Sequence, residues 1–316
     1  MATSTTGNTE KPRDRAAFWA ILSIPFIWGI GFPLTHNAVA HINPGLYAFS
    51  RSLVATVTLL PFAVPHLRKT DRRTLLAGLV LGVFSALNVV SQSYALSHLT
   101  SASTAFCITL NILFIPFIMM AIRGGKPSRL DLASVALGLL GIYIILGPNL
   151  DHFSVGYVWG GLAAFAIAMN ICLVGKLTSK GSEINRLALG FYQLLFATLA
   201  LVYFPFHQSL APVARTEVWI AIGFMGMFST ALAVYLQTRF QQRVGSTRTS
   251  VIFNLDLVFA SLFGLLNREP LSTAQVMGGA VAFLASMLES TQSLLKKLYT
   301  GLLNRWALAT RSAPRP

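Results

Sequence analysis

The chain has 316 residues, of which 54% are hydrophobic and only 11% are charged, and its mean hydropathy is +0.64. Soluble domains carry about 25% charged residues, so this composition excludes an ordinary soluble protein and indicates helices that lie in lipid. The formal net charge of +14 would favour a nucleic-acid partner in a soluble protein, but the basic residues lie in short segments between apolar runs. We therefore expect a lipid bilayer, and no nucleic acid, as partner.

Ten apolar runs follow one another along the chain, each long enough to cross a hydrocarbon core of about 30 Å as a helix. Short joints rich in Pro, Gly and Asn separate them, and no joint is long enough for a soluble domain. The sequence thus predicts an all-α membrane protein with ten transmembrane helices. In chain order the predicted helices are 17–38, 44–65, 75–96, 101–122, 130–147, 155–175, 186–206, 218–237, 249–266 and 272–288.

The positions of the basic residues predict how these helices are oriented. If the N-terminus is cytoplasmic, 21 of the 24 Lys and Arg residues fall in cytoplasmic segments; Arg215 and Arg268 fall outside, and Arg51 lies within a helix. Cytoplasmic loops of membrane proteins carry such an excess. We therefore expect both termini in the cytoplasm and a location in the bacterial inner (plasma) membrane.

The two halves of the chain resemble each other without gaps. Residues 91–111 match 236–256 at an offset of 145, which places Gln92 on Gln237 and Asn111 on Asp256. Residues 49–57 match 191–199 at an offset of 142, which pairs Arg51 with Gln193. Five helices in each half form an odd number, so the halves would have opposite orientations, as in many transporters. The predicted parts are a tail (1–16), a first five-helix repeat (17–148), a second (149–289) and a basic amphipathic tail (290–316) that would lie on the inner leaflet.

Several motifs, in order across the ten helices, resemble the EamA branch of the drug/metabolite transporter superfamily. They are WGIGFPLTH (28–36), Arg51, Gln92, AFCITLNILFIPF (105–117), TALAVYLQTRFQ (230–241) and STRTSVIFNLDLVFASLFGLLNREPLS (246–272). The family's Glu-Pro in the ninth helix is Asp256-Leu257 here, so the proline that would bend this helix is missing, and its Gly-Glu is Arg268-Glu269. The resemblance implies secondary transport, often export of amino acids or related metabolites, through a cavity between the halves.

Arg51 and Asp256 are the leading candidates for substrate binding or coupling. A charged side chain at the centre of a membrane helix costs about 2.5 to 3.5 kcal/mol, so it is a functional candidate by default. Both residues lie about seven positions into a predicted helix. Asp256 would recognise a substrate amine or carry a proton, and Arg51 would bind a carboxylate; the alternative is a structural ion pair that joins two helices.

Other polar and aromatic residues within the predicted helices form a second set of candidates. Amides in lipid need partners, so they should face a cavity or another helix. His36 lies near the outer end of the first helix, where it would titrate or contact water, and aromatic residues would line the cavity or simply pack. The additional candidates are Gln92, Asn111, Gln193, Gln237, Asn170, His36, Trp28 and Tyr192.

The sequence carries no motif for catalysis, metal binding or nucleotide binding. It has no His-Glu-x-x-His, no nucleophile elbow, no phosphate-binding loop and no clustered metal ligands. We therefore expect no enzyme activity, no cofactor and no metal. The predicted function is secondary-active transport of a small-molecule substrate by alternating access, with a proton as a candidate coupling ion, in a monomer or homodimer. An intramembrane enzyme and a non-transporting membrane scaffold are the alternatives.

Overall fold

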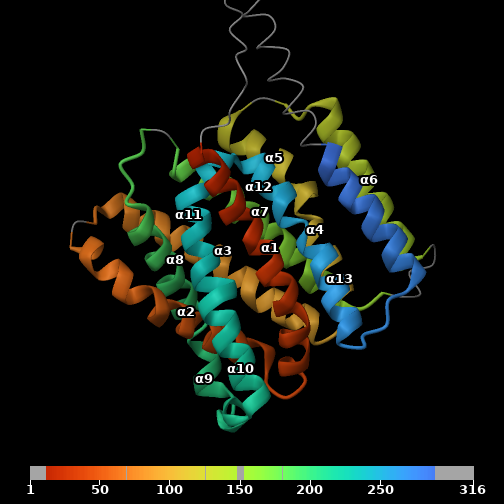
Figure 1. Cartoon of the computed structure of the whole chain (residues 1–316), viewed down its shortest axis with the longest axis horizontal. Helices are drawn as coiled ribbons and strands as arrows, with labels where there is room; N and C mark the ends of the chain where they lie inside the picture. The colour runs from red at the N-terminus through yellow and green to blue at the C-terminus, as the bar shows by residue number, and fades with distance from the viewer. Residues whose placement is uncertain (1–11, 69, 125, 148–152, 180, 289–316) are drawn as a thin grey trace, which may run out of the picture.

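The computed structural model describes residues 12–68, 70–124, 126–147, 153–179 and 181–288, and in these ranges the chain is helical with no strand (Figure 1). The predicted amphipathic tail, 290–316, lies outside the described residues. Within them, nine helical spans are long and apolar enough to cross a membrane. The last apolar helix described, Thr273–Leu288, is shorter than eighteen residues. Nine predicted crossings therefore have a matching span, and the tenth stays a prediction.

The helices begin near the predicted positions because the sequence supplies a cap at many of their starts. Asn43, Asp71, Ser154 and Asn185 each accept a hydrogen bond from a backbone N–H in the first turn that would otherwise have no partner. The α-helices are α1 (Pro12–Val39), α2 (Pro44–Leu67), α3 (Arg72–Leu96), α4 (Ser101–Thr109), α5 (Asn111–Arg123), α6 (Arg129–Leu146), α7 (Val155–Leu177), α8 (Arg186–Ala200), α9 (Tyr203–His207), α10 (Thr216–Phe224), α11 (Ala233–Val244), α12 (Ser246–Phe253), α13 (Asp256–Leu266) and Thr273–Leu288; a 3-10 turn, η1, covers Ala211–Ala214.

Two of the predicted helices are interrupted part-way along, although each remains one apolar span, Ser101–Ile122 and Arg248–Leu266. The fourth is divided at Leu110 into α4 and α5, and the ninth is divided at Asn254 and Leu255 into α12 and α13. The second half-helices start at Asn111 and Asp256, which the repeat had already matched to each other. The ninth helix is interrupted although it has no proline there. Side-chain hydrogen bonds from Ser250 to Asn111 and from Asn111 to Asn254 join the two interrupted helices.

The eighth predicted helix is continuous but changes its winding at mid-length. Between α10 and α11 lies η2 (Met225–Leu232), a π-helical segment. A π-helical turn closes its hydrogen bonds one residue further along the chain than an α-turn, and such segments are frequent at functional sites. Ser229 and Thr230, both in η2, face the site described below.

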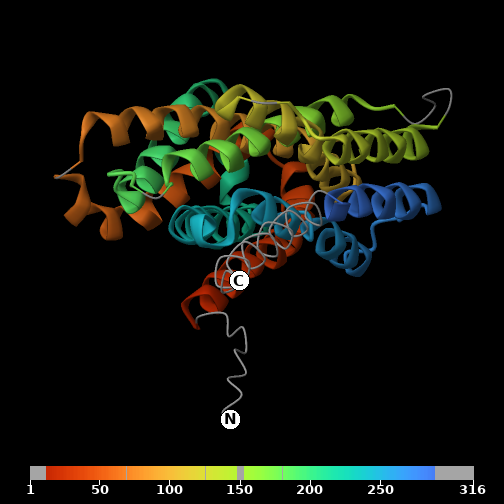
Figure 2. The ribbon, with the colours of Figure 1, turned by 90° about the horizontal axis from the view of Figure 1, so that it is seen from above.

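Elements of the first half pack mainly against elements of the second. α3 lies against α7 and α8, α2 against α8 and η2, and α1 against α13 and α11. In the view from above, the helices coloured orange (early in the chain) and green (later) interleave at one end of the molecule (Figure 2). Helix α6 and Thr273–Leu288 lie side by side at the other end (Figures 1 and 2).

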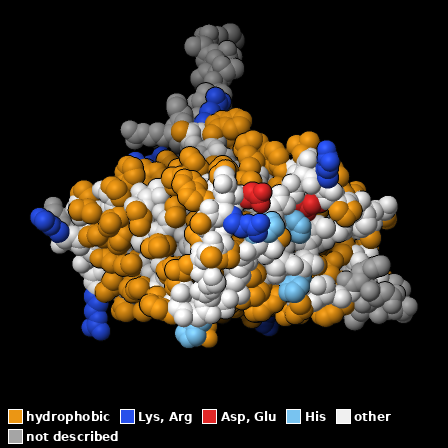
Figure 3. All heavy atoms as spheres, turned by 90° about the horizontal axis from the view of Figure 1, so that it is seen from below, with side chains coloured by type: hydrophobic (Ala, Val, Ile, Leu, Met, Phe, Trp, Pro, Cys, Tyr) orange, Lys and Arg blue, Asp and Glu red, His pale blue; other side chains and the backbone are white. Residues whose placement is uncertain are grey.

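The outer surface is largely apolar. Phe62, Phe206, Trp219 and Leu266 are each more than 60% exposed, and hydrophobic side chains cover much of the face shown in Figure 3, with few charged groups among them. A soluble monomer rarely exposes so large an apolar area. Together with the nine long apolar spans, this identifies the chain as a multi-pass membrane protein.

Replacing Gly278 by leucine is expected to destabilise the fold. A Cβ added at Gly278 would lie 2.7 Å from the backbone oxygen of Gly141 in α6, and one added at Gly141 would lie 2.9 Å from the backbone oxygen of Gly278. Small residues let membrane helices approach this closely, and overpacking costs about 1 to 3 kcal/mol. The thermal unfolding midpoint of the detergent-purified Gly278→Leu protein should fall. Gly161→Leu is the control, since a Cβ there meets no atom within 4 Å; equal midpoints for the two variants would contradict the close approach.

Candidate functional site

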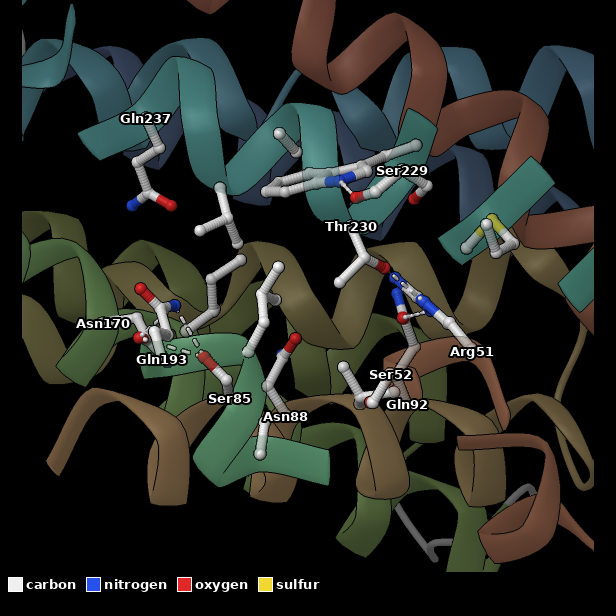
Figure 4. Close-up of a pocket in the computed structure, with 18 of the residues that line it drawn as sticks. Arg51, Ser52, Ser85, Asn88, Gln92, Asn170, Gln193, Ser229, Thr230 and Gln237 are labelled. Atoms are coloured by element: carbon white, nitrogen blue, oxygen red, sulfur yellow. Dashed lines mark hydrogen bonds between the residues drawn. The ribbon is translucent and has the colours of Figure 1, made fainter. Parts of the chain in front are cut away.

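A cavity lies in the middle of the helix bundle, between elements of both halves of the chain (Figure 4). Its volume is about 70 Å³, smaller than the roughly 150 Å³ that accommodates a benzene molecule. Its wall combines apolar side chains with buried polar ones. Seven of the ten predicted site residues lie on it: Trp28, Arg51, Gln92, Asn170, Gln193, Gln237 and Asp256.

Arg51 lies in α2 and is only 4% exposed. Its Nε donates a hydrogen bond to Thr230 Oγ1 in η2 at 2.8 Å, and its Nη1 donates to Gln92 Oε1 in α3 at 3.1 Å. Both partners are uncharged. Figure 4 shows the guanidinium between them, at one end of the residues drawn.

Asp256 is the first residue of α13 and is 2% exposed. Its Oδ1 is buried and has no hydrogen-bond partner. The break in the ninth helix places this residue at the start of α13 rather than in the middle of a continuous helix.

The structure does not contain the ion pair considered for Arg51 and Asp256. Across the residues that the structure describes, the one contact of this kind found is between His41 Nε2 and Glu217 Oε2, at 3.6 Å, and it is an ion pair only when His41 is protonated. Arg51 and Asp256 nevertheless line the same cavity. Two buried ionisable groups, one basic and one acidic, therefore line one space without bonding to each other.

An uncharged polar cluster forms a second end of the cavity. Gln193 Nε2 in α8 donates to Ser85 Oγ in α3 at 2.7 Å and to Asn170 Oδ1 in α7 at 3.3 Å. Gln193 Oε1 is buried and has no partner. In Figure 4, Gln193, Asn170 and Ser85 lie at the opposite end from Arg51, and Gln237 extends toward them from α11.

The two ends of the cavity use hydrogen bonds at matching positions of the repeat. Arg51 donates to Thr230, and Gln193 donates to Ser85. Arg51 and Gln193 are 142 positions apart, while Ser85 and Thr230 are 145 apart, the same two offsets that the sequence shows. Thr56 and Thr198, which also differ by 142, bond to each other at 2.9 Å. Each half of the chain thus provides one long polar side chain that bonds to a hydroxyl of the other half.

Trp28 closes one side of the cavity. Its Nε1 donates to the backbone oxygen of Ser229 in η2 at 2.8 Å, and its ring meets Phe253 edge-on with centroids 4.8 Å apart. These contacts fix the indole plane at the boundary between α1, η2 and α12. The Ser229 hydroxyl is buried without a partner and also lines the cavity.

Three predicted site residues do not line the cavity. Asn111 Nδ2 donates to Asn254 Oδ1 at 2.8 Å and supports the two helix breaks. His36 Nδ1 bonds with the backbone oxygen of Leu96 at 2.8 Å. Tyr192 packs with Phe191 and Phe196. A part in substrate binding stays a prediction for these three residues.

The sequence did not identify the serine and threonine residues whose side chains line the cavity. Ser85, Ser229 and Thr230 all line it, but serine and threonine are common in membrane helices and carry no signal alone. A usable signal did exist for two of them, because Ser85 and Thr230 match at the offset of 145. Hydroxyls that recur at the offset of a repeat are therefore candidates in their own right.

Hydrogen bonds between the halves also close one end of the bundle. Asn37 and Asn267 bond to each other through both amides, at 3.0 and 3.1 Å. Glu269 accepts from the backbone N–H and the hydroxyl of Ser101, at 2.6 and 2.7 Å, and so caps the start of α4. These contacts join α1, α4 and the end of α13. We call them the terminal latch.

Comparison with known proteins agrees with this architecture. The model of the EamA-like transporter family matches the chain twice, over residues 15–147 and 154–291. An uncharacterized transporter of Archaeoglobus fulgidus is 23% identical over 285 residues, covering 90% of this chain and 89% of that protein. The pseudopaline exporter CntI of Pseudomonas aeruginosa is 23% identical over 257 residues, covering 81% and 89%.

A similar fold also occurs among solved structures. One crystal structure superimposes with a TM-score of 0.62 at 16% identity, covering 88% of this chain and 98% of the other. This likeness concerns the fold alone. Since the family model covers almost the entire helical region in two consecutive matches, the chain belongs to the EamA-like transporter family.

Proposed function

We propose that this protein is a secondary-active exporter of small metabolites such as amino acids. It works by alternating access, with the cavity between two inverted five-helix halves as its substrate site. Both termini lie in the cytoplasm. Thr273–Leu288, a shorter apolar helix, forms the tenth crossing. A proton gradient, or the gradient of the substrate itself, drives transport.

Three observations support the inverted repeat. The family model matches once in each half. The broken fourth and ninth helices resume at Asn111 and Asp256, which are 145 positions apart. Arg51 of the first half bonds to Thr230 of the second, and Gln193 of the second half bonds to Ser85 of the first. These two bonds are equivalent under the repeat, because Arg51 matches Gln193 and Ser85 matches Thr230. Discontinuous helices that meet at a repeat interface are typical of secondary transporters.

The observation that carries the proposed substrate class is a basic and an acidic side chain that line one cavity without pairing. Arg51 and Asp256 are both at most 4% exposed and both face the cavity, and neither forms an ion pair within the described residues. A molecule that carries a carboxylate and an amine would supply the missing partner to each. Charge-assisted hydrogen bonds of this kind are strong and directional. An amino acid is the simplest such molecule.

Alternating access accounts for the small size of the cavity. A volume of about 70 Å³ does not hold an amino acid, so the halves must move apart to admit one. The interrupted helices provide places where the backbone can bend. The terminal latch closes one end of the bundle, and its exposed amide pair can separate at small cost.

Export is the favoured direction because a relative is named for it. The Pseudomonas aeruginosa relative is a pseudopaline exporter, and it aligns over 81% of this chain. An intramembrane aspartyl enzyme is disfavoured, because two carboxylates are needed and Asp256 is the single acidic residue among the described residues that line the cavity.

Transport by the purified protein tests this proposal. Proteoliposomes would be assayed with a panel of radiolabelled L-amino acids under an imposed pH gradient, and protein-free liposomes would serve as the control. We expect protein-dependent uptake of at least one amino acid, with a rate that changes when the gradient is reversed. If no amino acid moves under either gradient, the proposed substrate class is wrong.

A further inference from the structure

The uncharged end of the cavity contains an acceptor that finds no donor among the described residues. Gln193 is 3% exposed, and its Oε1 has no hydrogen-bond partner. A buried amide oxygen left without a donor costs about 1 to 3 kcal/mol. Because Gln193 also lines the cavity, its unpartnered oxygen is suited to bind a donor that arrives with the substrate.

The hydrogen-bond network fixes which way the Gln193 amide points. Asn170 Nδ2 donates to the backbone oxygen of Ala166 at 3.2 Å, so Asn170 presents its Oδ1, an acceptor, to Gln193. Only the nitrogen of Gln193 can donate to that oxygen. The oxygen of Gln193 must therefore be the atom left without a partner.

Arg51 and Gln193 lie at equivalent positions of the repeat, but Arg51 offers hydrogen-bond donors to the cavity and Gln193 offers an acceptor. Arg51 offers only donors, whereas the amide of Gln193, its counterpart in the repeat, has its nitrogen occupied and its acceptor free. Figure 4 shows the two residues at opposite ends, with Gln193 and Gln237 both directed into the space between α8 and α11. A substrate that spans the cavity would meet a cation at one end and a neutral acceptor at the other.

We propose that Gln193 is a specificity-determining residue, which selects amino acids whose side chain ends in an N–H or O–H donor. This inference rests on the proposed function. Arg51 holds the substrate carboxylate, and Gln193 Oε1 accepts a hydrogen bond from the far end of the substrate. Sites built to hydrogen-bond a substrate group discriminate strongly against analogues that lack it. L-Glutamine is therefore preferred over L-leucine, which has a similar size but no side-chain donor.

Competition in proteoliposomes tests this selectivity. The ratio of L-glutamine to L-leucine transport would be measured for the wild type, Gln193→Leu and Gln193→Glu, with L-lysine as a third solute. Because one buried hydrogen bond is lost, Gln193→Leu should lower the glutamine-to-leucine ratio by about tenfold or more. Gln193→Glu keeps the shape but adds a negative charge, and should shift the preference toward L-lysine. Gln208→Leu makes the same chemical change at an exposed position and should leave the ratio unchanged.

The outcomes separate this inference from the proposed function. If the wild type transports amino acids but both Gln193 variants keep its selectivity, Gln193 does not read the substrate and the inference is wrong. A wild type that prefers L-leucine overturns it as well. If the wild type transports no amino acid, the proposed function fails instead. Gel filtration of each variant shows whether it is folded. If Gln193→Leu does not fold, Gln193→Glu still tests the inference.

Discussion

Replacing Arg51 by glutamine is expected to reduce amino-acid transport by at least about a hundredfold. The change preserves a polar side chain of the kind found at the equivalent position of the other half, Gln193, but removes the cation. A substrate carboxylate would then lie buried without its partner, and breaking a buried charge pair costs about 3 to 5 kcal/mol. The initial rate of L-glutamine uptake in proteoliposomes measures this loss.

The control for this variant is Arg215→Gln, which removes a charge from an exposed position between η1 and α10. It should transport at the wild-type rate. Because the fold also uses the Arg51 bonds to Thr230 and Gln92, the thermal unfolding midpoint should be measured for both proteins. A folded Arg51→Gln protein with unchanged transport would show that Arg51 only joins helices.

Replacing Asp256 by asparagine is expected to abolish the transport of zwitterions. The substitution keeps the size of the side chain and its place in the first turn of α13, but it removes the negative charge that faces the cavity. The substrate amine then loses its charged partner, and we expect a fall in rate of about a hundredfold or more. Uptake of L-glutamine, measured with and without a pH gradient, reports this effect.

The pH gradient separates the two roles open to Asp256. If the carboxylate only binds the amine, residual transport by Asp256→Asn should keep its dependence on the gradient; if it carries the proton, that dependence should disappear. Glu217→Gln is the matched control, because Glu217 is exposed and is not among the residues that line the cavity. Wild-type rates in Asp256→Asn would exclude both roles.

Much of the fold was predictable because a bilayer requires long apolar helices with capped ends. The positions of Asn43, Asp71 and Ser154 before apolar runs mark helix starts that the structure contains. The helix breaks were not predictable in this way. Neither Leu110 nor Asn254 is next to a proline or a glycine, and the hydrogen bonds that join the two breaks link segments about 140 residues apart in sequence.

The site was predictable in its residue types but not in its pairings. Intramembrane charge identified Arg51 and Asp256, and the repeat identified Gln193 and Gln237, all of which line the cavity. The sequence gives the depth of each residue along its helix but not the direction in which its side chain points. For this reason the ion pair between Arg51 and Asp256 was not excluded until the partners of Arg51 were seen to be Thr230 and Gln92.

Counterflow is the measurement that tests the central claim, a carrier with one alternately exposed site, most directly. Proteoliposomes would be preloaded with unlabelled L-glutamine and diluted into buffer with a trace of labelled L-glutamine. A carrier that has moved unlabelled solute out of the liposome returns with labelled solute bound. The label inside the liposomes should therefore rise transiently above its equilibrium level. The Arg51→Gln protein should show no such peak. If label enters the wild-type proteoliposomes without a transient peak, the protein is a channel. If no label enters, it is a scaffold. Either result would contradict a carrier with one alternately exposed site.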